Sequence, residues 1–234
     1  MNPWIDLNWP DPETPLNAML DRLRDYYSIC VRAIEGERLD GLELRPLNRD
    51  IHGDNFTTDE GYWAAFAWHE QLWDEFLGQN VALEDSYPTT LRASVVILGC
   101  TRFESWLGEF CKQIKDRLSL SAAYHDMPNR KWACVPALSY LKKEAKLKLD
   151  RGRSPYTELS DLYLLRNALA HEKAVREGFK DKGVLIKFLK KGLIQRPDDR
   201  GILLHDGVID YTLATLKAAG SDLLRNGAKR LQEA

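Results

Sequence analysis

The sequence of 234 residues has few cysteines and no paired ones. None of its four cysteines belongs to a CxxC or CxxH pair, the spacing that marks zinc sites and dithiol redox centres. Both kinds of site are therefore disfavoured. We expect free, buried thiols, as in a reducing compartment, for all four: Cys30, Cys100, Cys111 and Cys134.

Long apolar runs are also missing. No stretch approaches the roughly 18 apolar residues that a membrane-spanning helix needs. The first fifteen residues are acidic and rich in proline, without the basic and then apolar order of a signal peptide. We therefore expect a cytoplasmic protein that makes no contact with membranes.

Several cofactor and catalytic motifs are absent as well. The sequence contains no GxxxxGK[ST], no GxGxxG after a strand, no HExxH and no GxSxG. These absences disfavour nucleotide hydrolysis, dinucleotide binding, zinc hydrolysis and α/β-hydrolase chemistry. No cofactor and no metal ion are expected.

What the sequence has in abundance is apolar residues at helical spacing. Hydrophobic residues make up 44% and charged residues 29%, as in ordinary globular domains. The pattern predicts an all-α fold, with helices over residues 16–37, 60–79, 89–120, 136–149, 156–173 and 208–231. Two short apolar runs, VLIKFL (184–189) and GILLH (201–205), predict a small β-hairpin before the last helix. Helix through residues 184–191 is the alternative for the first run.

Glycine and proline interrupt the chain between residues 38 and 58. They predict a division into an N-terminal extension, residues 1–58, and a helical domain, residues 59–234. The extension would pack its one helix on the body. The aromatic residues of the predicted helix 60–79 could stack on nucleic-acid bases, but core and dimer packing is the preferred interpretation.

Charge is distributed unevenly along the chain. Residues 1–90 carry 18 acidic and 6 basic side chains, and residues 91–234 carry 17 acidic and 27 basic ones. The net charges of the two parts are thus −12 and +10. Basic clusters at residues 142–153 and 180–196 suit a phosphate backbone, although a solvated helix face would look the same.

The predicted helix over residues 156–173, YTELSDLYLLRNALAHEK, ends in a polar group of three side chains. Arg166 and His171 are about 7.5 Å apart along a helix and roughly 140° apart around it, whereas Asn167 and His171 share a face. A guanidinium can bind two phosphate oxygens at once, and an imidazole can transfer protons near neutral pH. The amide of Asn167 can fix the tautomer of His171.

A carboxylate is predicted in the apolar centre of helix 89–120. A buried carboxylate needs a partner, and we hypothesise that Glu104 pairs with Arg166 or with Arg102. Such a pair could assist the polar group or could be a purely structural ion pair.

The Arg-Asn-x-x-x-His pattern late in an apolar helix resembles the motif of HEPN-domain ribonucleases. The preceding long segment, Leu91 to Ile114, resembles the helix that packs beside that motif, and the resemblance covers residues 59–234. It implies a HEPN-like helical bundle and a metal-independent endoribonuclease of a toxin–antitoxin or anti-phage system. The site residues it implies are Arg166, Asn167 and His171 as catalytic residues and Glu104 as an auxiliary one.

The same resemblance implies partners and leaves alternatives. HEPN proteins usually form homodimers in which two motifs meet in one composite active site, and an antitoxin or defence-system protein would be a further partner. The basic side chains expected to contact RNA are Lys142, Lys143, Lys146 and Lys173. The alternatives are a non-catalytic HEPN module that binds RNA or nucleotide or scaffolds a partner, and a purely structural role for the motif.

Overall fold

The computed structural model describes residues 13–41, 87–126, 134–170, 182–195 and 202–234. The chain divides into two compact units, one made of Met1–Tyr26 and Arg92–Ala234 and the other of Tyr27–Leu91. Helices α1 (Glu13–Gly41) and α3 (Tyr87–Arg117) each run from one unit into the other. The elements described below belong to the larger unit.

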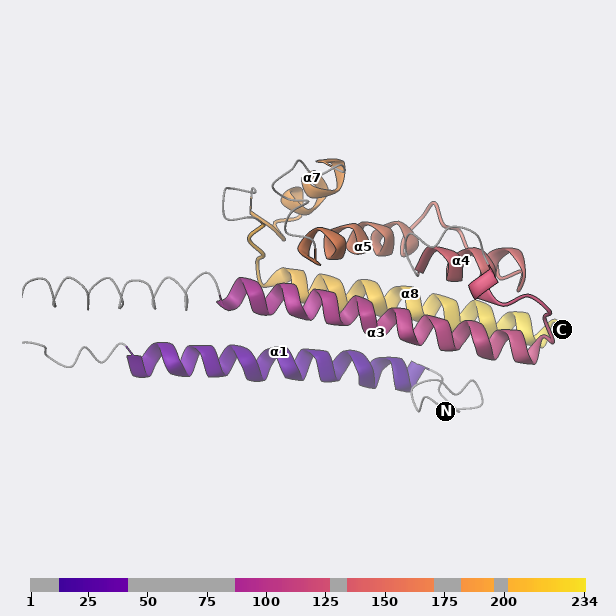
Figure 1. The fold of residues 1–234 in the computed structure, drawn as a ribbon, viewed down its shortest axis with the longest axis horizontal. Helices are drawn as coiled ribbons and strands as arrows, with labels where there is room; N and C mark the ends of the chain where they lie inside the picture. Colours follow the sequence, from indigo (N-terminus) through magenta and orange to yellow (C-terminus); the bar gives the residue numbers. More distant parts are fainter. Residues whose placement is uncertain (1–12, 42–86, 127–133, 171–181, 196–201) are drawn as a thin grey trace, which may run out of the picture. The chain divides into compact units, whose positions relative to one another are not determined.

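The centre of this unit is a pair of parallel helices, α3 and α8 (Gly207–Gln232), which lie side by side in Figure 1. A Cβ atom at Gly99 would lie 3.4 Å from Leu216, and one at Gly227 would lie 2.8 Å from Phe110. Contacts that advance together along both helices show that the helices run in the same direction. The absence of side chains at these glycines lets the two backbones approach closely.

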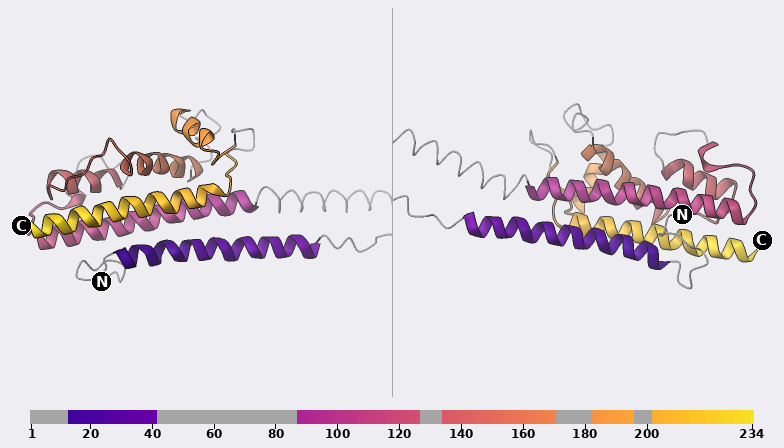
Figure 2. Two further views of the ribbon diagram at one scale, coloured as in Figure 1. Left: turned by 180° about the vertical axis from the view of Figure 1, so that it is seen from behind. Right: turned by 60° about the horizontal axis from the view of Figure 1, so that its bottom comes forward.

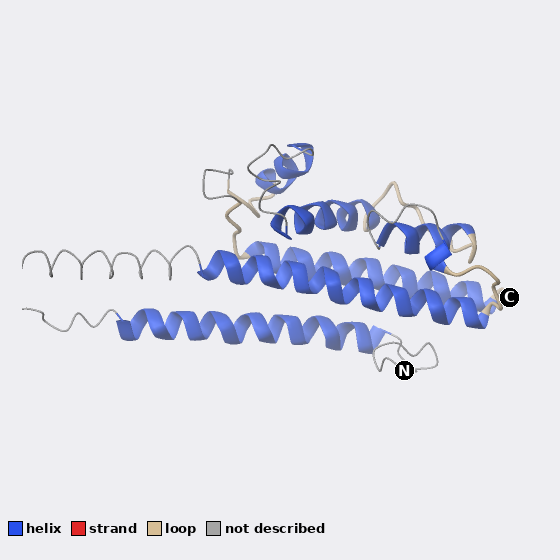
Figure 3. Cartoon of the chain, in the orientation of Figure 1, coloured by secondary structure: helices blue, strands red, loops and turns tan. Residues whose placement is uncertain are grey.

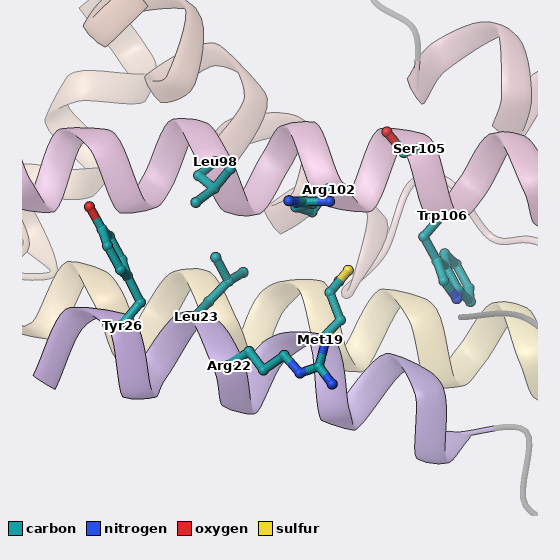
Figure 4. Close-up of a pocket in the computed structure, with 8 residues that line it drawn as sticks. All are labelled: Met19, Arg22, Leu23, Tyr26, Leu98, Arg102, Ser105 and Trp106. Atoms are coloured by element: carbon teal, nitrogen blue, oxygen red, sulfur yellow. The ribbon is translucent and has the colours of Figure 1, made fainter. Parts of the chain in front are cut away.

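The first half of α1 runs antiparallel to this pair. Leu23 lies near Gly99, and Arg24 forms an ion pair of 3.6 Å with Asp210. Figure 4 shows the facing side chains of α1 and α3, which line a groove of about 280 Å³. The floor of this groove is apolar because Leu23 and Trp106 are buried beneath it.

Helix α5 (Tyr156–Ala170) lies along α8, as the left view of Figure 2 shows, and its contacts run antiparallel to α8. Tyr156 donates a 2.7 Å hydrogen bond to Oδ2 of Asp222, and Tyr163 donates a 2.9 Å bond to the carbonyl of Cys100 on α3. These two bonds fix α5 against the central pair. Helix α4 (Cys134–Lys143) and the short 3₁₀ helix η2 (Tyr124–Asp126) lie farther along α3.

The predicted first strand of the hairpin is wrong, because residues 184–189 lie in helix α7 (Lys182–Lys190). The helix buries Val184, Leu185 and Phe188, and the Phe188 ring meets Tyr211 edge-on. Spacings of one and four residues fit one face of a helix, whereas a strand would bury alternate residues. The only β pairing in the described residues is an isolated antiparallel bridge between Ile194 and Leu204.

The other helix predictions agree with the structure to different degrees. The described part of the chain is helical, without strands, so the all-α class is confirmed there (Figure 3). The helix predicted over residues 136–149 is too long, because α4 ends at Lys143 and Lys146 has a φ of 60°. The predicted helix 60–79 and the domain boundary at residue 58 lie outside the described residues. No helix within the described ranges is long and apolar enough to cross a membrane.

Candidate functional site

Arg166 and Asn167 lie in the last full turn of α5, four and three residues before its end at Ala170. The apolar face of α5 buries Leu159, Leu162 and Leu165 against the bundle. Arg166 and Asn167 follow Leu165 directly, so they lie at the edge of the buried face, and both are half-buried. His171 and Lys173, the other predicted site residues of this segment, lie outside the described residues.

Among the described residues, the guanidinium of Arg166 is held by its neighbour and by no acidic side chain. Its Nη1 donates a 2.9 Å hydrogen bond to Oδ1 of Asn167. Its Nε is buried and has no hydrogen-bond partner among the described residues. A buried donor without a partner costs about 1–3 kcal/mol, so a charged, partly unpaired guanidinium at this place is unfavourable unless something else binds it.

The carboxyl of Glu104 lies within the electrostatic reach of Arg166. Burial raises the pKa of the Glu104 carboxyl above its ordinary value of 4.5, and the positive charge of Arg166 opposes part of this rise. No ion pair within the described residues joins the two side chains. Glu104 therefore interacts with Arg166 through space and does not neutralise it by direct contact. Of the two hypothesised partners, the charge effect favours Arg166, since Arg102 lines the groove between α1 and α3.

A buried thiol completes the surroundings of Arg166. Cys100 lies one helical turn before Glu104 on α3, so both face α5. Burial raises the pKa of Cys100 to about 12, against the opposing charge of Arg166. The sequence patterns did not connect this cysteine with Arg166 and Asn167 (the Arg166 group). Its four-residue spacing from Glu104, which puts both on one face of a helix, could have indicated the connection.

The thiols agree with the sequence prediction for the most part. All four cysteines are free, three of them are buried, and Cys30 is half-buried. Burial also raises the pKa values of Cys111 and Cys134 strongly. Their thiols are thus inert, which fits a packing role.

Three of the four lysines predicted to contact RNA lie in the described residues, at and just beyond the end of α4. Lys142 and Lys143 are exposed in the last turn of α4, and Lys146 is exposed just beyond it. The adjacent carbonyl of Ala145 accepts a 3.1 Å hydrogen bond from Arg230, near the end of α8. No hydrogen bond or ion pair in the described ranges connects these three lysines with the Arg166 group, and their role in RNA binding stays a prediction.

Part of the second basic cluster is neutralised by α5 itself. Lys187 forms an ion pair of 2.8 Å with Asp161, and Lys191 lies 3.7 Å from Glu158. These pairs attach α7 to α5. The charge of this cluster is therefore smaller than the sequence indicated.

A cavity of about 470 Å³ lies beside Glu104, between α3 and the segment that carries η2. Its wall includes Lys112, Lys115 and Tyr124, none of which the sequence patterns singled out. The clustering of these side chains depends on how residues 118–126 fold back along α3, and no spacing in the sequence encodes that.

Taken as chemistry, the Arg166 group can bind an anion. A guanidinium that forms no ion pair with the described residues offers a donor fork for phosphate or carboxylate oxygens, and Asn167 orients it. In the described part of the chain, no group of three His, Cys, Asp or Glu side chains is placed to hold a metal ion.

No family model, curated protein or solved structure matches the chain.

Proposed function

We propose that the protein is a metal-independent endoribonuclease of the HEPN type. The observation that carries the proposal is the state of Arg166, whose guanidinium is bonded to Asn167, has a buried Nε without a partner and forms no ion pair in the described residues. Five residues further along the chain, the sequence places His171. A cation followed five residues later by an imidazole is suited to chemistry at a phosphodiester.

The proposed reaction is a transesterification within the RNA strand. A base removes the proton from a ribose 2′-OH, whose oxygen attacks the adjacent phosphorus while the bond to the 5′-oxygen breaks. The departing oxygen takes a proton from an acid, and the products carry a 2′,3′-cyclic phosphate and a 5′-OH. His171 serves as base or acid, and Arg166 stabilises the charge on the non-bridging oxygens.

Asn167 and Glu104 have positioning roles in this proposal. The bond from Arg166 to Asn167 restricts the rotation of the guanidinium. The carboxyl of Glu104 attracts the same guanidinium from α3 without forming an ion pair, so the positive charge stays available for phosphate. Both residues act on the reaction through Arg166.

One imidazole cannot easily be both base and acid in a single step. A homodimer with two motifs in one composite site would supply a second His171 and a second Arg166. Such an arrangement is what the HEPN resemblance implies, together with a role in toxin–antitoxin or anti-phage defence and a protein partner that restrains the enzyme.

The test is cleavage of RNA by the purified protein in EDTA, with analysis of the product ends. Wild type should yield 2′,3′-cyclic phosphate ends, and His171→Ala and Arg166→Ala should abolish cleavage. Matched controls are His205→Ala and Arg225→Ala, which remove exposed residues of the same types. A substrate with 2′-deoxyribose throughout should remain intact because it lacks the nucleophile.

Other outcomes would change the proposal. RNA binding without cleavage, equal in wild type and variants, would replace the ribonuclease by a non-catalytic RNA-binding module. Cleavage that survives both Arg166→Ala and His171→Ala would remove the assigned roles. Circular dichroism of every variant separates loss of chemistry from loss of helix.

A further inference from the structure

The cavity beside Glu104 has the size and lining of a ligand site. Its volume of about 470 Å³ falls within the range of small-molecule pockets. One wall is a strip of α3 that includes Glu104, Glu109 and Lys112, and the facing wall is formed by Ala123, Tyr124 and His125. Charged groups of both signs and an aromatic surface therefore meet in one space.

The aromatic wall is held in place by three contacts. The amide of Ala123 donates a 2.9 Å hydrogen bond to Oδ2 of Asp126, and Tyr140 donates a 3.1 Å bond to the carbonyl of Ala122. The rings of Tyr124 and His125 lie 3.8 Å apart between centroids. The segment thus presents a fixed aromatic surface to the cavity, without cost for ordering it on binding.

Gly108 shapes the opposite wall. A Cβ atom at this position would lie 3.0 Å from the hydroxyl oxygen of Tyr124, closer than side chains normally approach. The glycine lets the hydroxyl of Tyr124 lie close against α3. Any larger residue would push the ring away.

The two lysines of the cavity are available for an anion. Lys112 and Lys115 are three residues apart and lie on one face of α3. Within the described ranges, neither ammonium group forms a hydrogen bond or an ion pair, although Glu104, Glu109 and Asp116 line the same cavity. The carboxylates can accept hydrogen bonds from N–H groups, while the ammonium groups can bind a phosphate.

From these groups we infer that the cavity binds one nucleotide of a single-stranded RNA. The base stacks on Tyr124, its amino group donates to Glu109, and the phosphate lies between Lys112 and Lys115. Carboxylates accept from the amino groups of cytosine, adenine or guanine, and uracil has no such group. The site therefore favours these three bases over uracil.

The cavity and the proposed catalytic group share Glu104. Lys112 lies eight residues beyond Glu104, about 12 Å along α3. A strand whose phosphate lies at Arg166 can therefore continue along α3 into the cavity. This assignment to a bound strand rests on the proposed function.

The test measures RNA binding by the full-length His171→Ala protein, which is expected not to cut the probe. Fluorescent 12-residue oligo(C), oligo(A) and oligo(U) are titrated at several salt concentrations. Oligo(C) and oligo(A) should bind more tightly than oligo(U). Tyr124→Ala should weaken their binding at least about fivefold, the loss of one stacked base, and Tyr124→Phe should restore it.

The lysines are tested by the slope of affinity against salt. Lys112→Ala with Lys115→Ala should reduce this slope by about 0.7, since the two lysines are placed on one phosphate and each phosphate neutralised on a single strand contributes about 0.7. The matched control pair is Lys217→Ala with Lys229→Ala, two exposed lysines of α8. Tyr87→Ala, at an exposed tyrosine, is the control for Tyr124→Ala.

Free CMP and AMP form a separate arm, because a mononucleotide has the same chemistry. Binding of a mononucleotide that depends on Tyr124 and both lysines supports the nucleotide site, and the comparison with the oligomers shows which source it prefers. Equal effects of the cavity and control variants, or no binding of any probe, would overturn the inference. If the cavity substitutions are made in the protein that keeps His171 and the rate of RNA cleavage does not change, the nucleotide site is overturned and the ribonuclease stands. If the cavity binds the probes but wild type cuts no RNA, the nucleotide site stands and the ribonuclease is overturned.

Discussion

Arg166 and Asn167 are consecutive residues of α5, and their side chains bond to each other through Nη1 and Oδ1 at 2.9 Å. Neighbours in a helix point about 100° apart, so this bond requires the long arginine side chain to turn toward the amide. It holds the guanidinium at the edge of the bundle. The buried Nε beside it lacks a partner in the described residues.

The first prediction concerns the fork of this guanidinium. Arg166→Lys keeps the positive charge but removes the planar pair of donors, so cleavage should fall about 10²- to 10³-fold in kcat, as when one oxyanion-binding donor is lost. Asn167→Ala should cost less, because the guanidinium remains but can rotate. Single-turnover cleavage of one defined RNA measures both. The control Arg225→Lys, on the exposed face of α8, should leave the rate unchanged. If Arg166→Lys cleaves as fast as wild type, a positive charge alone is enough for cleavage and the paired donors of the guanidinium are not needed.

A second prediction follows from the buried environment of Glu104. Burial raises the pKa of this carboxyl above 4.5, so the folded protein holds the proton to higher pH than the unfolded chain does. The contribution of this group to stability is then fully present below pH 4.5 and is lost as pH rises through the folded pKa. Glu104→Gln cannot ionise. Its Tm should therefore rise relative to that of wild type as the pH is raised above 4.5.

Arg166 makes this second prediction sharper. Its charge opposes the rise in the pKa of Glu104, so Arg166→Ala should extend the loss of stability to higher pH. In the Glu104→Gln background, Arg166→Ala should no longer alter the pH dependence. Glu109→Gln measures the effect of losing a negative charge from the same helix. A Tm difference between Glu104→Gln and wild type that stays constant with pH would contradict the assignment.

The helices could be predicted where one apolar face is continuous, as in α5, which begins at the expected Tyr156. The end of α4 was misjudged although its pattern is visible in the sequence. Ala145, Leu147 and Leu149 are buried while Lys146 and Lys148 are exposed. Burial of alternate residues is the mark of extended chain, so the helical prediction failed because apolar content was weighed above its period.

The candidate site was predictable only in part, for a different physical reason. The Arg166–Asn167 group is local and could be found from its spacing. The proximity of Cys100 and Glu104 to Arg166 depends on where α5 crosses α3, which the bond from Tyr163 to the Cys100 carbonyl fixes.

Charge counts also failed to show that Asp161 and Glu158 neutralise two lysines of the second basic cluster.

A third prediction concerns the thiols. Three of the four thiols are buried, so a reagent cannot reach them: Cys100, Cys111 and Cys134. Burial also raises their pKa values, so they do not form the reactive thiolate. A native protein treated with DTNB should therefore release one equivalent quickly, from the half-buried Cys30. All four thiols should react in denaturant. Cys30→Ser should abolish the fast equivalent, and a second fast thiol would show that the core opens locally.

The last prediction tests the close approach of α1 to α8. A Cβ atom at Gly220 would clash with Leu16, whose side chain is fully buried and cannot swing into solvent. Gly220→Ala should therefore lower the free energy of unfolding by about 1–3 kcal/mol, as overpacking does. Gly183→Ala is the matched control, since no atom lies within 4 Å of its added Cβ and the residue is exposed in α7. That substitution should be neutral or should stabilise by up to about 1 kcal/mol.

Urea unfolding measures both, and Leu16→Ala should reduce the cost of Gly220→Ala because it opens the space that the new methyl group needs. If Gly220→Ala costs the same with and without Leu16, the contact between α1 and α8 is not the source of its effect.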